Sequence, residues 1–203
     1  MVDTVWKPPL AVAAVISHGS DVTLSSPRFT FRPLQESDLP TLREWLLRPH
    51  VAEWWGPAES IAELRENYIA AAAERGATRA YMAYEGAAPI GFIQVYVVMG
   101  AGGGWWPDET DPGARGTDQF LAEARRMGQG LGPAMLRAFL DQLFAEPAVT
   151  VVQTDPHPTN RRAIRAYARA GFHEVGLVAT PDGPALLMRC TRQSLARAVE
   201  NTA

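Results

Sequence analysis

Apolar residues recur along the chain with two spacings, and each spacing predicts one kind of element. Alternating or unbroken apolar runs predict strands at Phe29–Pro33, Ala80–Glu85, Pro89–Val98, Thr117–Ala122, Val149–Thr154, Phe172–Thr180 and Ala185–Thr191. Apolar positions three or four residues apart predict helices along Leu39–Leu46, from Ser60 to about Arg75, over Pro133–Leu143, over Thr159–Ala170 and in the tail Thr191–Glu200. Elements in this order predict an α/β fold, with a central mixed β-sheet flanked by helices on both faces.

Polar and special residues mark where several of these helices begin and end. Ser60 followed by Glu63 forms a capping box, so a helix is expected to start there. Pro49 is expected to stop the first helix, because proline cannot continue the helical hydrogen bonds. Gly171 follows the Thr159–Ala170 helix, at the place where a glycine commonly ends the last turn.

A chain of 203 residues is long enough for one domain with a sizeable core. Residues 1–21 are expected to be a poorly specified N-terminal extension, and residues 22–203 a single domain. The apolar stretch Leu10–Ile16 is too short to cross a membrane, and Asp3 lies upstream of it where a signal peptide has basic residues. We therefore interpret it as part of the extension rather than as a signal peptide.

Composition narrows the possible partners. The net charge of −3 argues against nucleic acid, because phosphate binding requires clustered Lys and Arg, and it leaves room for a cationic substrate. The four histidines form no pair at metal-ligand spacing, so no metal site is expected. The single cysteine, Cys190, excludes an internal disulfide and is typical of a reducing compartment, so a cytoplasmic protein is expected.

A glycine-rich turn, Met127–Gly132, lies between an expected strand and an expected helix. Glycine permits close approach of a ligand to the backbone, and a helix N-terminus offers unpaired N–H groups with a partial positive charge. Together they favour a phosphate or pyrophosphate site, although a plain turn without a ligand stays open. A Walker A loop is excluded because Pro133 follows Gly132, and the glycine spacing differs from that of dinucleotide-binding loops.

The helix after the strand Val149–Thr154 carries a second candidate group. Asn160 and Tyr167 are seven positions apart, so they project from nearly the same helix face, about 10 Å apart along the axis. An asparagine amide can bind amide groups of an extended ligand, and a tyrosine hydroxyl can donate a proton to a leaving group. The alternative is that Tyr167 is an ordinary core aromatic residue.

These two motifs and the strand between them resemble the Gcn5-related N-acetyltransferase (GNAT) superfamily. Its signature, Gln/Arg-x-x-Gly-x-Gly/Ala, aligns with Met127–Gly132, where Met127 replaces the usual Gln or Arg. The resemblance implies the GNAT acyltransferase fold and acetyl-CoA as cosubstrate. It implies contacts to acetyl-CoA from Gln119, Phe120, Leu121, Met127, Gly128, Gln129, Gly130, Leu131, Gly132, Asn160 and Ala163.

Acidic and tryptophan-rich segments extend the resemblance. Glu53-Trp54-Trp55-Gly56, Gly104-Trp105-Trp106, Gln153-Thr154-Asp155-Pro156 and Thr180-Pro181-Asp182-Gly183-Pro184 resemble aminoglycoside 6'-N-acetyltransferases, most closely those of type Ib. An aminoglycoside carries several ammonium groups on sugar rings, so carboxylates and flat aromatic surfaces suit it. The residues expected to bind it are Trp54, Trp55, Tyr68, Trp105, Trp106, Glu109, Asp155 and Asp182. For any one of these residues, the alternative is an ordinary solvated loop charge or a core aromatic side chain with no part in binding.

The resemblance also implies roles in the reaction. Asp118 aligns with the aspartate that the resembling enzymes use as a base, and it lies on the strand that leads into the glycine turn. Tyr167 is expected to protonate the departing CoA thiolate. Attack is expected to be direct, without an acyl-enzyme, because Cys190 lies in an apolar run typical of a buried structural thiol.

Two alternatives stay open from the sequence. One is a GNAT enzyme that acetylates a different amine, such as a protein N-terminus, a polyamine or a siderophore precursor. The other is a non-catalytic binder of a cationic drug or of acetyl-CoA. No nucleic acid or membrane partner is expected, and the sequence does not determine the oligomeric state.

Overall fold

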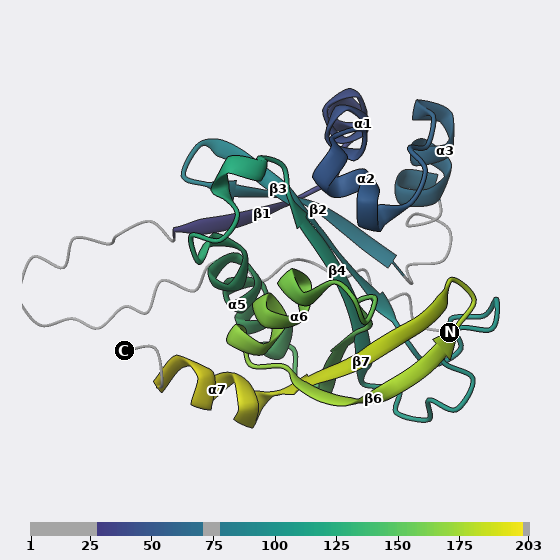
Figure 1. Cartoon of the computed structure of the whole chain (residues 1–203), viewed down its shortest axis with the longest axis vertical. Coiled ribbons are helices and arrows are strands. Elements are labelled where there is room, and N and C mark those ends of the chain that lie inside the picture. Colours follow the sequence, from purple (N-terminus) through teal and green to yellow (C-terminus); the bar gives the residue numbers. More distant parts are fainter. Residues whose placement is uncertain (1–27, 71–77, 201–203) are drawn as a thin grey trace, which may run out of the picture.

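A computed structural model describes residues 28–70 and 78–200. Seven strands form one mixed sheet in the order β1-β2-β3-β4-β5-β7-β6 (Figure 1). The strands are β1 (Phe29–Pro33), β2 (Thr78–Glu85), β3 (Ala88–Val97), β4 (Ala114–Leu121), β5 (Val151–Thr154), β6 (His173–Thr180) and β7 (Gly183–Thr191). The expected α/β architecture is confirmed. The expected extension, residues 1–21, lies outside the described residues.

Helices cover both faces of this sheet, because successive strand residues point to opposite sides. On one face, Tyr81 and Ile93 pack in one cluster with Phe139 of α5. On the other face, Met82 and Phe92 pack in a second cluster with Leu42 of α1. The first face carries α5 (Leu131–Phe144), α6 (Arg161–Arg169) and α7 (Arg192–Glu200); the second carries α1 (Leu39–Leu46), α2 (Pro49–Trp55) and α3 (Ile61–Arg65).

The first helices differ from the sequence prediction in two respects. Pro49 does not simply stop α1; it is the first residue of α2, where a proline loses nothing because the first N–H groups of a helix have no intrahelical partner. The capping box at Ser60 is confirmed, with Ser60 N donating to Glu63 Oε2 at 2.7 Å. The helix that it starts changes at Glu66 into a π-helical turn, Glu66–Ala70, and Arg75 lies outside the described residues.

β4 and β5 separate soon after they meet. These parallel neighbours pair only at Ala114↔Val151, Arg115↔Val152 and Gly116↔Gln153. Beyond Gly116, β4 continues to Leu121 and pairs with β3 alone. A cleft therefore opens in the middle of the sheet, between strands that elsewhere would be hydrogen-bonded.

Gly116 stands at the point of separation and has a packing reason to be glycine. A Cβ atom there would lie 2.0 Å from Cζ of Tyr96, its cross-strand partner. The ring of Tyr96 thus occupies the space that a side chain at position 116 would need.

We expect Gly116→Ala to lower the free energy of unfolding by about 1–3 kcal/mol, because the added methyl group overpacks a filled site. Urea denaturation measures this. Gly132→Ala is the matched control, since its nearest neighbour would be Leu121 Cδ1 at 3.8 Å and alanine suits a helix. Equal stability of the wild type and Gly116→Ala would contradict the packing argument.

Candidate active site

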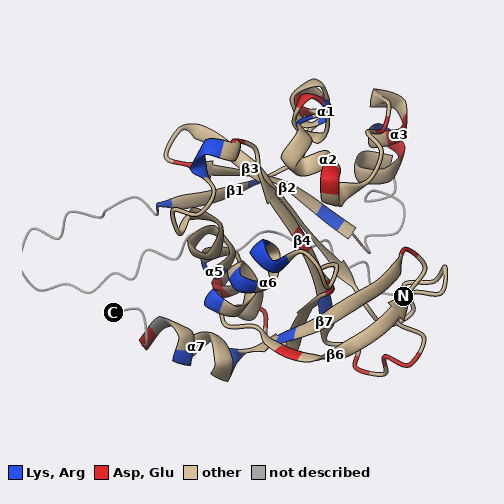
Figure 2. Cartoon of the chain, in the orientation of Figure 1, with Lys and Arg blue, Asp and Glu red and all other residues tan. Residues whose placement is uncertain are grey.

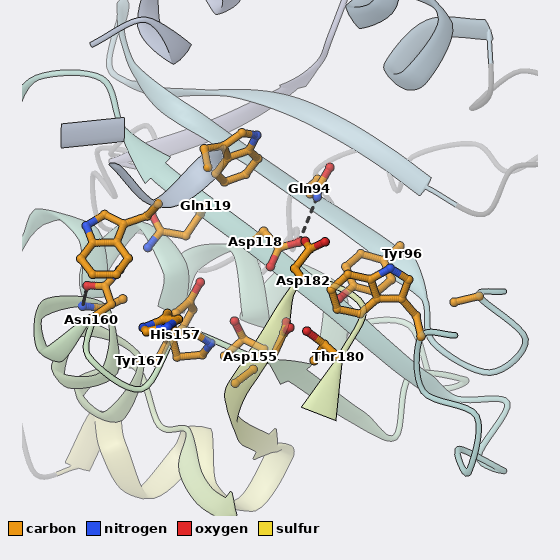
Figure 3. A pocket seen from close by; sticks show the side chains of 18 of the residues that line it. Gln94, Tyr96, Asp118, Gln119, Asp155, His157, Asn160, Tyr167, Thr180 and Asp182 are labelled. Atoms are coloured by element: carbon orange, nitrogen blue, oxygen red, sulfur yellow. Dashed lines mark hydrogen bonds between the residues drawn. The ribbon is translucent and has the colours of Figure 1, made fainter. Parts of the chain in front are cut away.

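The cleft between β4 and β5 opens into a cavity of about 780 Å³ (Figure 3). Its size lies within the range of small-molecule binding sites. Ten of the polar residues that line it come from five segments of the chain, which are β3, β4, the loop after β5, α6 and the β6–β7 turn. They are Gln94, Tyr96, Asp118, Gln119, Asp155, His157, Asn160, Tyr167, Thr180 and Asp182.

Asp118 lies on β4, on the side of the cleft next to β3. Gln94, its cross-strand partner on β3, donates a hydrogen bond from Nε2 to Asp118 Oδ2 at 2.9 Å. Burial raises the pKa of Asp118, and the hydrogen bond from Gln94 opposes that rise. The carboxylate is thus a better proton acceptor than a solvated one, and Gln94 holds its orientation.

Tyr167 reaches the same cavity from α6, on the opposite face of the sheet. Its side chain is 5% exposed, and its ring packs edge-on against Phe172 with centroids 5.3 Å apart. Burial raises the pKa of Tyr167, and the nearby charge of Asp118 raises it further. The hydroxyl therefore stays protonated and can act as a proton donor. Only the separation of β4 and β5 lets groups from the two faces meet.

Three carboxyl groups converge at one end of the cavity. Asp118, Asp155 and Asp182 project into it from β4, from the segment after β5 and from the β6–β7 turn (Figure 3). Burial, followed by the charges of Asp118 and Asp182, raises the pKa of Asp155 to about 7. Like charges held together in this way favour a ligand with several positive charges.

Aromatic side chains form the walls of this acidic end. Trp54 and Trp105 line the cavity, and Trp54 is 38% exposed. Trp55 and Tyr68 also line it, while their rings pack against Phe92 with centroids 5.6 and 5.4 Å away. Burial raises the pKa of Tyr68 to about 12, so its hydroxyl remains neutral.

A groove of about 210 Å³ continues the cavity toward the N-terminus of α5. Gly128 and Gly130 adopt φ of +75° and +78°, a region that favours glycine, and a Cβ at either would meet nothing within 4 Å. The expected acetyl-CoA contacts that line this groove are Gln119, Phe120, Leu121, Met127, Gly128, Gly130, Gly132, Asn160 and Ala163. Gln119, Asn160 and Ala163 also line the larger cavity, so the two form one continuous site.

Arginines of α6 line the same groove, and the sequence reading missed them. Arg162, Arg165 and Arg169 are spaced three and four residues apart, so they share one helix face. None of the three forms an ion pair with the residues that the structure describes. Figure 2 shows this basic helix apart from the acidic turn between β6 and β7. Their positions along the helix that begins after Asn160 were a sequence signal that could have identified them.

Four predicted residues lie outside both linings. Trp106 is half-buried, and its Nε1 has no hydrogen-bond partner in the described part of the chain. Glu109 is engaged by Arg189, with 2.6 Å between Oε2 and a guanidinium nitrogen. The side chain of Gln129 donates to Arg125 O at 2.7 Å, and that of Leu131 lies in the core. Leu131 can therefore offer a ligand only its backbone, whereas Gln129 also keeps an exposed side-chain oxygen.

Gln94 and Tyr96 are cavity residues that the sequence did not single out. Gln94 follows from the register of β3 with β4, which places it opposite Asp118. Tyr96 lies two residues along the same strand face. No local motif marks these two residues, because strand pairing brings them to the site.

Two absences hold for residues 28–70 and 78–200. No three His, Cys, Asp or Glu side chains are placed to hold a metal ion. No helix in this part of the chain has the length and apolar character needed to cross a membrane.

The acetyltransferase (GNAT) domain family matches residues 35–180. Among curated proteins, aminoglycoside N(6')-acetyltransferase type 1 of Klebsiella pneumoniae is 47% identical over 185 residues, which are 90% of this chain and 92% of that protein. A kanamycin resistance protein of Rhizobium radiobacter is 56% identical over 95 residues, which are 47% of this chain and 88% of that protein.

Solved structures show similarity to the same class of enzyme. Aminoglycoside acetyltransferase AAC(6')-Ib in complex with coenzyme A has a TM-score of 0.79 and 48% identity, over 83% of this chain and 98% of that chain. The same enzyme with coenzyme A and kanamycin has a TM-score of 0.78 and 47% identity, again over 83% and 98%.

We expect Asp155 to titrate near pH 7 in the folded protein, and Asp182→Asn to lower that pKa because a like charge is removed. The pKa is raised above its unfolded value of about 4, so the folded state binds the proton more tightly. Stability should therefore decline as the pH rises from about 4 to 7. Carboxyl ¹³C NMR measures the titration, and a midpoint below 5 would contradict this environment.

Proposed function

The chain belongs to the acetyltransferase (GNAT) domain family, and on this basis we propose that it transfers the acetyl group of acetyl-CoA to the 6'-amino group of an aminoglycoside antibiotic, which confers resistance. One observation carries the proposal. A single continuous site joins a groove lined by glycines and by arginines that form no ion pair with the described residues to a cavity lined by tryptophans and four carboxyl groups, three of which converge at one end. Such a site suits one polyanionic and one polycationic substrate.

The groove has groups that fit acetyl-CoA. The backbone N–H groups at Gly128 and Gly130 and the N-terminus of α5 suit the pyrophosphate. Oε1 of Gln119 is buried without a partner among the described residues, and it suits an amide N–H of the pantetheine arm. When bound, acetyl-CoA supplies the thioester whose carbonyl carbon is attacked.

The arginines of α6 suit the remaining phosphate of acetyl-CoA. Arg162, Arg165 and Arg169 extend the groove along the helix from Asn160. Guanidinium groups pair with phosphates through parallel N–H donors, which makes arginine a common phosphate ligand. We assign to these residues the 3'-phosphate, which lies at the end of the molecule far from the thioester.

The cavity suits the acceptor for complementary reasons. Asp155 and Asp182 can pair with ammonium groups on different sugar rings, and Trp54 and Trp105 offer flat surfaces to the rings themselves. A small polycation matches this convergent set of acids better than a protein N-terminus, which has one amine and needs an open groove.

Asp118 acts on the attacking amine. Only a neutral amine attacks a thioester, whereas an alkyl ammonium is mostly protonated at pH 7 and acidic neighbours keep it so. Asp118 accepts the proton, directly or through a water, and its raised pKa makes it a stronger base than a solvated aspartate. The backbone N–H groups of β4 between Asp118 and Leu121 are candidates to stabilise the oxyanion, because β5 does not pair with this part of the strand.

Tyr167 acts on the leaving group. It keeps its proton at neutral pH and donates it to the sulfur as the C–S bond breaks. A thiol pKa near 8.5 makes the thiolate a tolerable leaving group on its own, so Tyr167 is expected to matter less than Asp118. Cys190 is buried, and burial raises its pKa to about 11, which leaves it without a role as a nucleophile.

Incubation with acetyl-CoA and kanamycin or tobramycin tests the proposal. We expect release of free thiol and a product acetylated at the 6' amine, located by NMR. Asp118→Asn should lower kcat by about 100-fold or more, the range of general base catalysis, with the Kd for acetyl-CoA nearly unchanged. No thiol release with any aminoglycoside, together with release with a polyamine or a peptide, would redirect the proposal to that amine.

A second prediction concerns the arginines. We expect the wild type to bind acetyl-CoA about tenfold or more tightly than 3'-dephospho-acetyl-CoA, and Arg165→Ala to lose most of that difference, because a charge-assisted contact is removed. Calorimetry of both ligands measures it without an acceptor. Arg161→Ala is the matched control, since this neighbouring exposed arginine does not line the groove. Equal discrimination in all three proteins would contradict the assignment.

The location of the reaction and the domain limits rest on sequence alone. A cytoplasmic enzyme whose residues 1–21 are dispensable remains our prediction.

A further inference from the structure

The carboxylate of Glu109, a loop residue, accepts three hydrogen bonds. Its carboxylate accepts hydrogen bonds at Oε1 from the backbone N–H groups of Thr110 and Asp111, at 3.0 and 2.9 Å. Oε2 accepts from a guanidinium nitrogen of Arg189 at 2.6 Å. The side chain of Glu109 is only 9% exposed, whereas that of Arg189 is 36% exposed. Both oxygens are therefore committed, and Glu109 is not free to bind a cationic ligand.

The loop that carries Glu109 joins β3 to β4 and forms part of the cavity wall. Trp105, within this loop, lines the acidic cavity. Glu109 N donates to Trp106 O at 3.1 Å, so the anchored residue is one hydrogen bond from the tryptophan pair. The rings of Trp105 and Trp106 lie against each other, with centroids 6.1 Å apart. The position of Glu109 thus influences the position of the aromatic wall.

Arg189 does not line the cavity, but it belongs to the hairpin that supplies the other side of the acceptor cavity. It lies on β7, which forms a hairpin with β6, and the turn of that hairpin carries Asp182. The loop also comes close to this turn directly, since a Cβ on Gly104 would lie 3.5 Å from Pro181 Cγ. The Glu109–Arg189 ion pair therefore joins the loop that holds an aromatic wall to the hairpin that holds a carboxylate.

We propose that Arg189 is a positioning residue for the acceptor substrate: through Glu109 it sets the distance between the Trp105 surface and the Asp182 carboxylate. The proposal rests on the proposed function, because a multi-ring polycation must stack one ring on the wall while another ring's ammonium reaches the acid. A one-ring amine does not need both contacts at once. Arg189 accordingly selects for extended acceptors without touching them.

A purely stabilising ion pair would have different consequences. Its loss would lower the free energy of unfolding and leave the kinetic constants of the folded enzyme unchanged. A positioning role instead predicts a rise in the KM of the acceptor, larger for a three-ring aminoglycoside than for glucosamine, with the KM of acetyl-CoA unchanged. The two roles separate in this comparison because the acetyl-CoA groove is lined by no residue of the β3–β4 loop or of the β6–β7 hairpin.

The test uses Arg189→Met, Glu109→Gln and the double variant in the full chain. Glu109→Gln keeps an oxygen for the two backbone N–H groups and replaces the charged oxygen that accepts from Arg189 with an uncharged NH2 donor. We expect either single variant to raise the KM for kanamycin about tenfold, as small misplacements of binding groups do, with kcat changed less than twofold. The double variant should be no worse than either single one, because both disrupt the same contact.

Arg32→Met is the matched control. The Arg32–Asp38 pair has nearly the same length, 2.7 Å, and nearly the same exposure, 35% and 12%, but neither residue lines the cavity. We expect this variant to be less stable, with the KM for kanamycin unchanged. An equal rise in KM for Arg32→Met, or additive effects of the two single variants, would overturn the proposal.

Amide hydrogen exchange tests the anchoring without any substrate. The N–H groups of Trp105 and Glu109 donate within the loop, to Gly102 O and Trp106 O, and should exchange faster in Arg189→Met. Unchanged exchange there overturns the present proposal even if the wild type proves inactive. Absence of acetylation by the wild type, with faster exchange in the variant, counts instead against the proposed function.

Discussion

The parallel pairing of β4 with β5 lasts for three residue pairs, and the site exists because it stops there. A sheet normally separates what lies on its two faces. Where these strands part, Asp118 from the side of α1 and α2 meets Tyr167 from the side of α5 and α6 in one cavity. Gly116 makes this separation compatible with a filled core, since the ring of Tyr96 occupies the space beside it. The unpaired edge of β4 and the α5 N-terminus then face the same opening.

Charge is distributed along this opening in a way that the net charge conceals. The chain carries −3 overall, yet one end of the site is lined by Arg162, Arg165 and Arg169 and the other by three carboxyl groups. Burial and the charges of Asp118 and Asp182 raise the pKa of Asp155, and a cationic acceptor would relieve this repulsion. Two substrates of opposite charge are thereby directed to opposite ends, with Asp118 and Tyr167 between them.

The residues that sequence motifs identified differ in whether the structure places their side chains at the site. The glycines of the turn and the Asn160–Tyr167 helix lie where local pattern placed them, since a turn and a helix are set by nearby residues. Trp106 and Glu109 stand in the right loop, yet their side chains do not line the cavity. An acid in a loop beside a site is as ready to pair with a distant arginine as with a ligand, and Arg189 lies 80 positions along the chain.

The sequence by itself determined the order of the strands and of every helix except α2, the glycine turn, the capping box at Ser60 and the family, because these depend on local periodicity and short motifs. It misjudged Pro49, since the same residue that ends one helix can begin the next. Only the tertiary structure decided which carboxylates face the acceptor and that Gln94 orients Asp118. It also decided that three arginines of α6 line the groove and that Arg189 forms an ion pair with Glu109. Those outcomes depend on strand register and on the separation of β4 from β5, which bring together residues that no local pattern connects.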